Sequence, residues 1–156
     1  MWFAEFTKPL REVIRNVLKN KDYDPVFVDE LPTRSNLTPE QKRELATNST
    51  IDDMIIANIR RAKFVIADLS CCPGEKMESK IYKKLDGTPE SRDIVCAGAY
   101  FEAGYAAGLE KPIIYLVHSK QAPHFDVNHI PYITWDEGVL DDLEVKLKNG
   151  IEARGL

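Results

Sequence analysis

The sequence contains little cysteine and lacks a long apolar run. Only Cys71, Cys72 and Cys96 occur among 156 residues, an odd number with two adjacent members, which excludes a disulfide framework and favours the reducing cytoplasm. The longest stretch with at most one charge, Ile94 to Leu109, has 16 residues, whereas a bilayer span needs about 20. No basic-then-apolar leader precedes Glu5. We therefore expect a cytoplasmic protein with no membrane partner and no secretory signal.

Positive charge is not in excess, and several site motifs are missing. Lys and Arg number 21 against 25 Asp and Glu, a net charge of −4, so no nucleic acid partner is expected and a small molecule or a protein is favoured. The patterns G-x-G-x-x-G, G-x-x-x-x-G-K-[ST] and G-x-S-x-G do not occur, which leaves dinucleotide, P-loop and serine hydrolase sites without their key residues. The cysteines and histidines show no metal-ligand spacing, so we expect no metal and no cofactor.

What the sequence does contain is an alternation of helical and strand patterns. Apolar residues make up 44% and charged residues 29%, typical of one globular domain that spans residues 1–156. Apolar residues three and four positions apart predict an amphipathic helix from about Leu10 to Leu18, with Thr7 as its N-cap. The same reasoning predicts further helices over about Ile51–Ala62, Gly98–Leu109 and Leu140–Ile151.

Four short apolar runs predict buried parallel strands. They are Val26–Val28, which is followed by Asp29; Phe64–Ala67, which is followed by Asp68; Ile113–Val117; and a last strand near Tyr132–Trp135. Strands that alternate with helices in this way build a parallel sheet with helices on both faces. The predicted fold class is therefore a three-layer α/β fold.

Two connections are too long for simple turns. One runs over about 30–49, with a short helix predicted at Pro39–Leu45, and the other over 71–97, with a helix predicted at Lys76–Leu85. Both follow a strand and so lie over the carboxyl ends of the sheet, where open α/β folds bind ligands. They are either lids and partner surfaces or solvated loops. Because ten of the 27 residues in 71–97 are charged, we expect this segment to be mobile or to become ordered at a subunit interface.

The candidate catalytic residue with the most unusual surroundings is Glu102. It is the only charge in the stretch from Ile94 to Leu109, with Gly98 and Gly104 on either side. An ionised carboxylate in apolar surroundings costs several kcal/mol unless a ligand or hydrogen-bond donors compensate. The alternative is a glutamate on the solvated side of a surface helix.

Asp68 and Asp29 are two further candidates, because each follows directly on a predicted strand. Acids at this position hold sugar hydroxyls in related sheets, although they also cap turns and helices. Asp68 is predicted to face the same crevice as Glu102. Two carboxylates in one pocket, with Tyr100 or Tyr105 nearby, suit acid and nucleophile chemistry at an anomeric carbon.

These residues resemble a known family, the nucleoside 2-deoxyribosyltransferase-like proteins, and in particular an uncharacterised bacterial branch. The stretches that carry the resemblance are 1–3 (Met-Trp-Phe), 52–62, 64–70 (Phe-Val-Ile-Ala-Asp-Leu-Ser), 100–106 (Tyr-Phe-Glu-Ala-Gly-Tyr-Ala), 124–126 (His-Phe-Asp) and 133–135 (Ile-Thr-Trp). Together they extend over nearly the whole chain. Their combination is fairly specific, although each stretch alone is a weak signal.

The resemblance implies a flavodoxin-like sheet and cleavage of the N-glycosidic bond of a nucleoside or nucleotide. Glu102 matches the family's nucleophile, which forms a glycosyl ester, and Asp68 lines the pocket. The remaining residues assigned to substrate binding are Phe3, Asp29, Gly98, Tyr100, Tyr105, His124 and Asp126. The family assembles as dimers or larger homo-oligomers in which one subunit completes its neighbour's site.

The resemblance also implies that the first strand of the fold is missing or truncated in this sequence. In the family a strand precedes the Met-Trp-Phe segment, and here that segment begins at Met1. We therefore expect the strands at Val26–Val28 and Phe64–Ala67 to lack their central neighbour unless another segment takes its place. Two other functions stay open: a non-catalytic nucleotide-binding or sensing module on the same scaffold, and a TIR-like nucleotide hydrolase that acts on NAD.

Overall fold

The computed structural model describes residues 8–30, 51–83 and 89–156 of the chain. Three strands, β1 (Val65–Asp68), β4 (Ile113–His118) and β5 (Tyr132–Trp135), form a parallel sheet in the order β1-β4-β5. In register, Val65 pairs with Ile113 and Tyr115 pairs with Tyr132. Because both pairings are parallel, the three carboxyl ends meet at one edge of the sheet.

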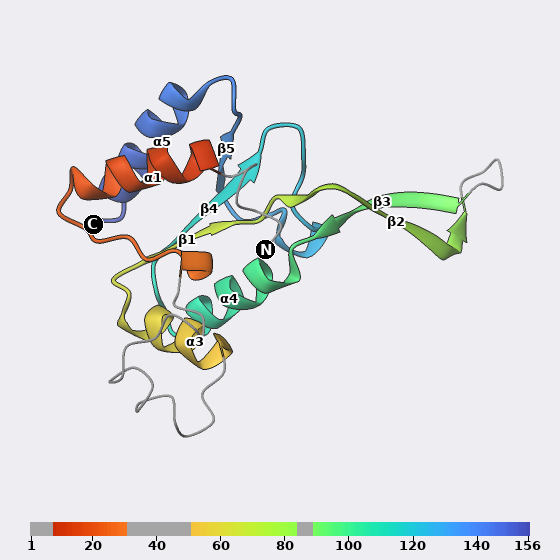
Figure 1. Ribbon diagram of the computed structural model, residues 1–156, viewed down its shortest axis with the longest axis horizontal. Coiled ribbons are helices and arrows are strands. Elements are labelled where there is room, and N and C mark those ends of the chain that lie inside the picture. Colours follow the sequence, from red (N-terminus) through yellow and green to blue (C-terminus); the bar gives the residue numbers. More distant parts are fainter. Residues whose placement is uncertain (1–7, 31–50, 84–88) are drawn as a thin grey trace.

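Helices cover both faces of this sheet, so the fold has three layers and is flavodoxin-like (Figure 1). On one face, α1 (Lys8–Lys19) and α5 (Leu140–Glu152) pack against Ile114, Leu116 and Trp135. On the other face, α3 (Ile51–Arg61) and α4 (Ala97–Gly108) pack against a second apolar cluster, which includes Ala67 and Val117. The residues of β4 alternate between these two cores.

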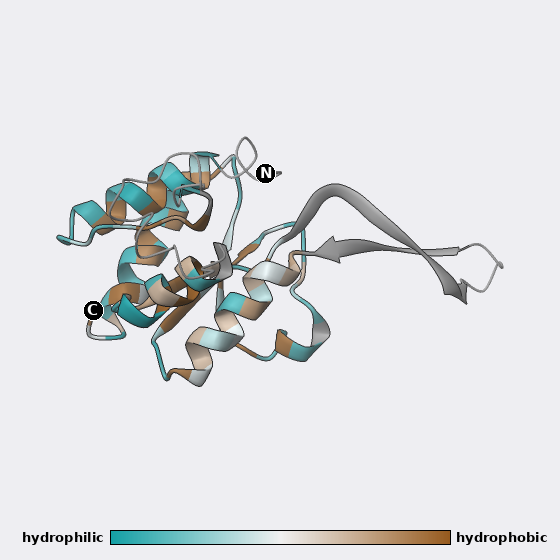
Figure 2. Cartoon of the chain, turned by 60° about the horizontal axis from the view of Figure 1, so that its bottom comes forward, coloured by the Kyte–Doolittle hydropathy of each residue, from teal (hydrophilic) through white to brown (hydrophobic). Residues whose placement is uncertain are grey.

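The four longer predicted helices, at about 10–18, 51–62, 98–109 and 140–151, and three of the four predicted strands are confirmed. Figure 2 shows hydrophobic and hydrophilic residues mixed along α1, as an amphipathic helix requires. Its apolar positions Leu10, Ile14, Val17 and Leu18 are buried. In α5, Leu143, Leu147 and Ile151 are buried as well. Within the described residues, no helix is both long enough and apolar enough to cross a bilayer.

The prediction of a strand at Val26–Val28 is wrong. These residues pair with no strand of the described chain; Val26 is 59% exposed, and Val28 begins a short 3-10 helix, η1 (Val28–Glu30), which contains Asp29. A strand needs a hydrogen-bonded neighbour, whereas this segment packs beside α1. There the guanidinium of Arg15 lies 4.9 Å from the ring centre of Phe27, and it donates a hydrogen bond of 2.6 Å to Glu30.

The prediction of a helix at Lys76–Leu85 is wrong too. This region forms β2 (Cys71–Lys83), which pairs antiparallel with β3 (Pro89–Val95) in a hairpin that leads away from the main sheet in Figure 1. In its register Met77 faces Arg92 and Glu78 faces Ser91. The segment is a strand because it pairs with β3. The spacing of residues within 76–85 does not reveal this pairing. Whether the segment is mobile or ordered by a partner stays a prediction.

The outer edge of β1 has no neighbour among the described residues. Among these residues its backbone pairs with β4 on one side only, and whether another segment takes the place of the central neighbour stays a prediction. The predicted cap Thr7, Phe3 and the predicted helix at Pro39–Leu45 lie outside the described residues.

Candidate functional site at the carboxyl edge of the sheet

The last residue of each strand in the main sheet bears a side chain with polar atoms. Asp68 ends β1, His118 ends β4 and Trp135 ends β5. Because side chains alternate along a strand, Asp68 follows Ile66, and His118 follows Leu116, toward the face covered by α1 and α5. Ligands of open α/β folds bind at this carboxyl edge, so these three residues mark the candidate site.

Asp68 is held by three donors at one of its two oxygens. Its Oδ1 accepts hydrogen bonds from the backbone N–H of Ser70 at 3.1 Å, from the Ser70 hydroxyl at 2.5 Å and from the Trp135 indole at 3.4 Å. No donor among the described residues contacts Oδ2, and no described polar side-chain atom is both fully buried and without a partner. Oδ2 therefore retains access to solvent.

Burial shifts the ionisation of Asp68. Removal from water raises the pKa of this carboxyl above its ordinary value, because the charged form loses hydration. The hydrogen bonds from Ser70 and Trp135 favour the charged form and offset part of the effect, as does the nearby His118. Asp68 thus retains a proton at higher pH than an ordinary aspartate.

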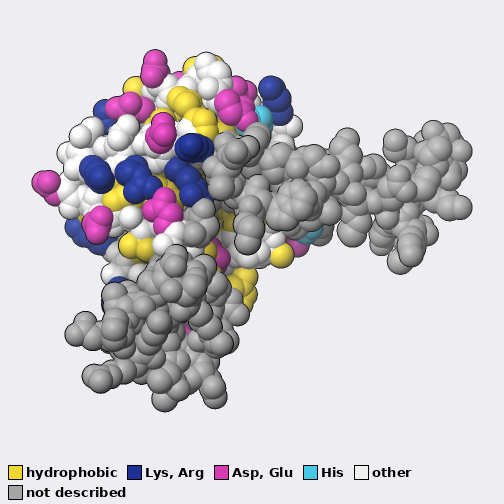
Figure 3. Space-filling view, in the orientation of Figure 1, with side chains coloured by type: hydrophobic (Ala, Val, Ile, Leu, Met, Phe, Trp, Pro, Cys, Tyr) yellow, Lys and Arg dark blue, Asp and Glu magenta, His cyan; other side chains and the backbone are white. Residues whose placement is uncertain are grey.

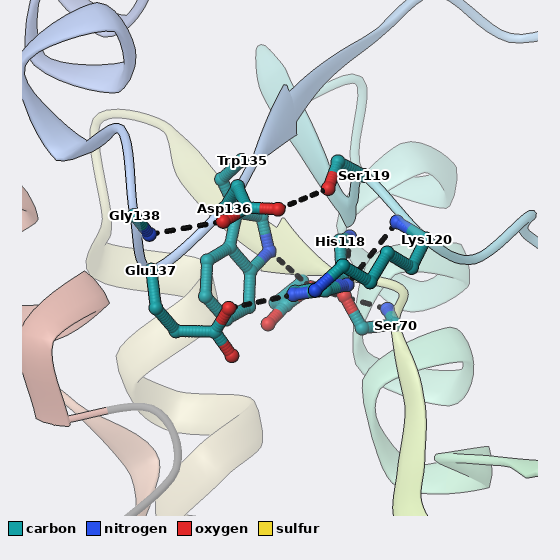
Figure 4. A network of polar contacts seen from close by, with 9 residues as sticks. Ser70, His118, Ser119, Lys120, Trp135, Asp136, Glu137 and Gly138 are labelled. Carbon is teal, nitrogen blue, oxygen red and sulfur yellow. Dashed lines mark hydrogen bonds and ion pairs between the residues drawn. The ribbon is translucent and has the colours of Figure 1, made fainter.

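His118 is almost completely buried, and it holds a second carboxylate in place. Its Nδ1 accepts the backbone N–H of Lys120 at 3.2 Å, so the ring proton of the neutral imidazole is on Nε2, 3.0 Å from Glu137 Oε2 (Figure 4). The ring also packs edge-on against Trp135, with ring centres 4.9 Å apart. The hydrogen bond from His118 lowers the pKa of Glu137, which therefore stays ionised.

His118, Asp136 and Glu137 have the composition of a metal centre, with ligand atoms within 4.8 Å of one another. Their hydrogen bonding does not fit a metal ion. The nitrogen of His118 that faces Glu137 carries the ring proton and offers no lone pair to a cation. Asp136 is held by the Ser119 hydroxyl at 2.6 Å and by the Gly138 N–H at 2.9 Å. The group is better described as a hydrogen-bonded network that joins the ends of β4 and β5.

Glu102 lies in the second turn of α4 and is half-buried. A Cβ built on Gly98, one turn earlier, would lie 3.9 Å from Glu102 Oε1, so glycine leaves space beside the carboxylate. The neighbouring Ala103 and Ala106 are buried against the sheet. α4 covers the opposite face from Asp68, so these two carboxylates come from different faces of the sheet.

Tyr100 joins three parts of the predicted site. Its hydroxyl donates to the backbone carbonyl of Leu69 at 3.3 Å and accepts the backbone N–H of His124 at 2.8 Å. His124 Nδ1 in turn lies 3.1 Å from Asp126 Oδ2. The structure thus brings α4, the end of β1 and the His-Phe-Asp stretch together.

Other predicted residues lie apart from this group. The Tyr105 hydroxyl accepts a hydrogen bond of 2.7 Å from Arg60 of α3. Asp29 is in η1, and Phe3 is outside the described residues. An open pocket of about 390 Å³ also lies elsewhere, between β5 and α5 near the amino ends of the strands, and includes Tyr132, Lys146 and Arg154. None of the predicted site residues lines it.

Sequence reasoning missed Ser70, His118, Trp135 and Glu137 as parts of the site. A signal was present, because His118 directly follows the predicted strand Ile113–Val117, just as Asp68 follows Phe64–Ala67. Applying the strand-end argument to every strand would have found His118 and the acids after Trp135.

Figure 3 shows acidic and basic side chains interspersed on one face of the molecule, without a basic field there that would suggest nucleic acid.

Comparison of the chain with protein-family models, with curated proteins and with solved structures finds no match. The functional argument therefore depends on the residues and their geometry.

Proposed function

We propose that this protein cleaves or transfers the N-glycosidic bond of a nucleoside or nucleotide, with Glu102 as nucleophile and Asp68 as the second catalytic carboxylate. The observation that carries the proposal is the contact between their elements. Tyr100, two residues before Glu102, donates to the carbonyl of Leu69, the residue after Asp68. Both carboxylates therefore belong to segments that touch at the carboxyl edge of the sheet.

Glu102 and Asp68 come from opposite faces of the sheet, and this arrangement suits a nucleophilic displacement at the anomeric carbon. A nucleophile attacks an anomeric carbon from the side opposite the leaving base, so the two catalytic groups must flank the sugar. In the first step a Glu102 oxygen forms a bond to the anomeric carbon, the C–N bond breaks, and its electron pair passes to the base, which takes up a proton. Water or a second base then displaces Glu102 and gives up a proton.

The proposed substrate contacts extend from this centre. His124 and Asp126, held beside Tyr100, provide polar groups for the sugar or the base. The proposal includes assembly as a homo-oligomer, with a second copy contributing to the site. No metal or cofactor enters either step.

A mass-spectrometric screen of nucleosides, nucleotides and NAD tests the reaction. Base exchange supports a transferase, and release of the base with free sugar or sugar phosphate supports a hydrolase. Release of nicotinamide from NAD would instead favour the TIR-like reaction. Tight binding without turnover would replace the proposal with a sensing module.

Glu102→Gln tests the nucleophile. The amide keeps the shape of the side chain but cannot form the ester, so we expect turnover to fall by a factor on the order of 10³ or more while ligand binding persists. Glu12→Gln, on an exposed position of α1, is the matched control and keeps full activity. Equal rates for Glu102→Gln and the wild type exclude the covalent route.

A further inference from the structure

A second concave region lies between β5 and α5, apart from the candidate site. This β5–α5 pocket is open, has a volume of about 390 Å³ and is bordered by residues 131–134 and by the carboxyl-terminal half of α5 with Arg154 after it. Its volume is within the range of small-molecule sites. No described residue of the proposed reaction borders it. The β5–α5 pocket is therefore a candidate for a separate binding site.

The charged residues that border the β5–α5 pocket are basic. They are Lys146 and Arg154, and no described acidic residue accompanies them, although the whole chain has a net charge of −4. Lys146 forms an ion pair with Asp142 at 2.6 Å, in which both side chains are about half exposed. An exposed pair of this kind contributes little to stability. An anion in the pocket can therefore share or replace Asp142 as the partner of Lys146.

Arg154 folds back along α5 and brings its guanidinium to Gly150. One N–H donates to the Gly150 carbonyl at 2.8 Å, and the carbonyls of Asn149, Ile151 and Glu152 accept backbone N–H groups. The carbonyls at the end of α5 are thus satisfied, which offsets the negative end of the helix dipole. Because a guanidinium has five N–H donors, the others of Arg154 are available to a ligand.

Gly150 keeps the space between α5 and β5 open. A Cβ built on this residue would lie 3.2 Å from Ile133 Cδ1 and 3.7 Å from Arg154 Nη1. A side chain would therefore occupy the space between the strand and the guanidinium. Glycine inside a helix lowers its stability relative to alanine, and here its absence of a side chain leaves the β5–α5 pocket its room.

The backbone of β5 adds a further donor. The Trp135 carbonyl accepts the N–H of Ser119 at 2.7 Å, so Trp135 directs its backbone groups toward β4. Because these groups alternate along a strand, the N–H of Thr134 points to the outer edge of β5. That edge has no neighbouring strand among the described residues. Thr134 borders the β5–α5 pocket, where its N–H can donate to an anion.

We propose that the β5–α5 pocket binds a small molecule that carries a carboxylate or phosphate group beside an apolar ring. The anionic group lies between Arg154 and Lys146 and accepts the N–H of Thr134. The ring lies against Tyr132 and Ile133, which supply the apolar part of the wall. This site goes beyond the proposed function, because it shares no described residue with the glycosidic reaction and needs no bond to be made or broken.

Binding of three probes tests the site. Phenyl phosphate, benzoate and inorganic phosphate are titrated separately into the ¹⁵N-labelled protein, and the amide shifts of Gly150 and Thr134 are followed. We expect saturable shifts, with phenyl phosphate bound more tightly than inorganic phosphate because of its ring. The tighter of phenyl phosphate and benzoate identifies the anionic group. Equal affinities for phenyl phosphate and inorganic phosphate overturn the ring contact, and no saturable shift with any probe overturns the site.

Three charge variants locate the binding. Arg154→Gln should weaken it about tenfold, because charge-assisted hydrogen bonds are lost. Lys146→Gln should weaken it about threefold, because its charge is more exposed. Lys148→Gln is the matched control: this residue is also on α5 and paired one turn earlier, with Glu144, but it does not border the pocket, so the affinity should not change.

An equal loss in all three variants would mean that the probes respond to the general charge of α5, and it would overturn the β5–α5 pocket as the site. Urea unfolding of each variant shows whether the fold is intact. Because the readout is binding, the result does not depend on turnover, and a negative result leaves the proposed glycosidic reaction untouched.

Discussion

Asp68 and Glu137 lie at the same edge of the sheet, and their surroundings move their pKa values in opposite directions. Burial raises the pKa of Asp68, whereas the hydrogen bond from His118 lowers the pKa of Glu137. Opposed shifts in neighbouring carboxyls are typical of sites that need one proton carrier and one permanent charge. Each shift also has a consequence for stability, because the ionisation differs between the folded and unfolded chain.

Asp68→Asn is expected to stabilise the folded protein at neutral pH. An acid whose pKa rises on folding costs stability above its ordinary value of 3.8, and the cost is complete above the folded-state pKa. The amide removes this cost and keeps an acceptor for Ser70 and Trp135. Urea unfolding should therefore show a more stable variant near pH 7, and the difference should vanish at about pH 3, where both forms are neutral.

Glu137→Gln is expected to change the stability of the folded protein in the opposite direction. Its lowered pKa contributes stability above the ordinary value of 4.5, and this contribution is lost as the pH falls through the folded-state pKa. The variant should therefore be less stable than the wild type at neutral pH. The loss should be slight, because the carboxylate is exposed and screened by solvent. Equal effects of the two substitutions would contradict the surroundings described for Asp68.

At the scale of elements, packing outweighs surface charge in holding the helices. α5 carries two ion pairs, each between residues one turn apart: Lys146 with Asp142 and Lys148 with Glu144, both at 2.6 Å. Such pairs contribute about 0.3 to 0.5 kcal/mol each. Burial of a leucine side chain contributes roughly 1.5 to 3 kcal/mol, so the apolar side of α5 decides its position.

Leu147→Ala measures this difference. Leu147 is fully buried in the core between α1, α5 and the sheet, so its truncation leaves a cavity and should lower the free energy of unfolding by about 2 to 5 kcal/mol. Val145→Ala, at a position that is 56% exposed, should change it by less than about 0.5 kcal/mol. Similar losses for both variants in urea unfolding would show that α5 does not pack as described.

At the scale of the whole molecule, the three-layer arrangement is most complete around β4. This strand pairs with β1 and β5 and contributes to both apolar cores. β1, by contrast, is paired on one side among the described residues. The Val65 N–H donates to the carbonyl of Pro112 at 2.9 Å, and the Leu69 N–H to that of Leu116 at 2.8 Å. Protection should therefore differ along the strands.

Amide hydrogen exchange tests this difference. Successive residues of a strand direct their N–H groups to opposite sides, so the amides of Ile66 and Asp68 face the outer edge of β1. We expect them to exchange faster than those of Val65 and Leu69, and the amides of β4 to exchange slowest. Equal protection of Ile66 and Val65 in solution would indicate that another segment pairs with this edge.

The sequence alone predicted the elements whose pattern is local. The spacing of Leu10, Ile14 and Val17 requires only that one side of a helix be buried, and the run 113–117 is apolar enough for a central strand. Asp68 was identified by its place after such a run. These inferences hold because the burial of a periodic apolar pattern depends little on what covers it.

Only the tertiary structure decided the features that depend on distant partners. The segment Val26–Val28 has the composition of a strand, but without a described neighbour it packs on α1 instead. The bond from Trp135 to Asp68 joins residues 67 positions apart, and it exists because β1 and β5 flank β4. Local pattern determines which segments are helices and strands, whereas the assembled sheet decides which polar atoms meet at its edge.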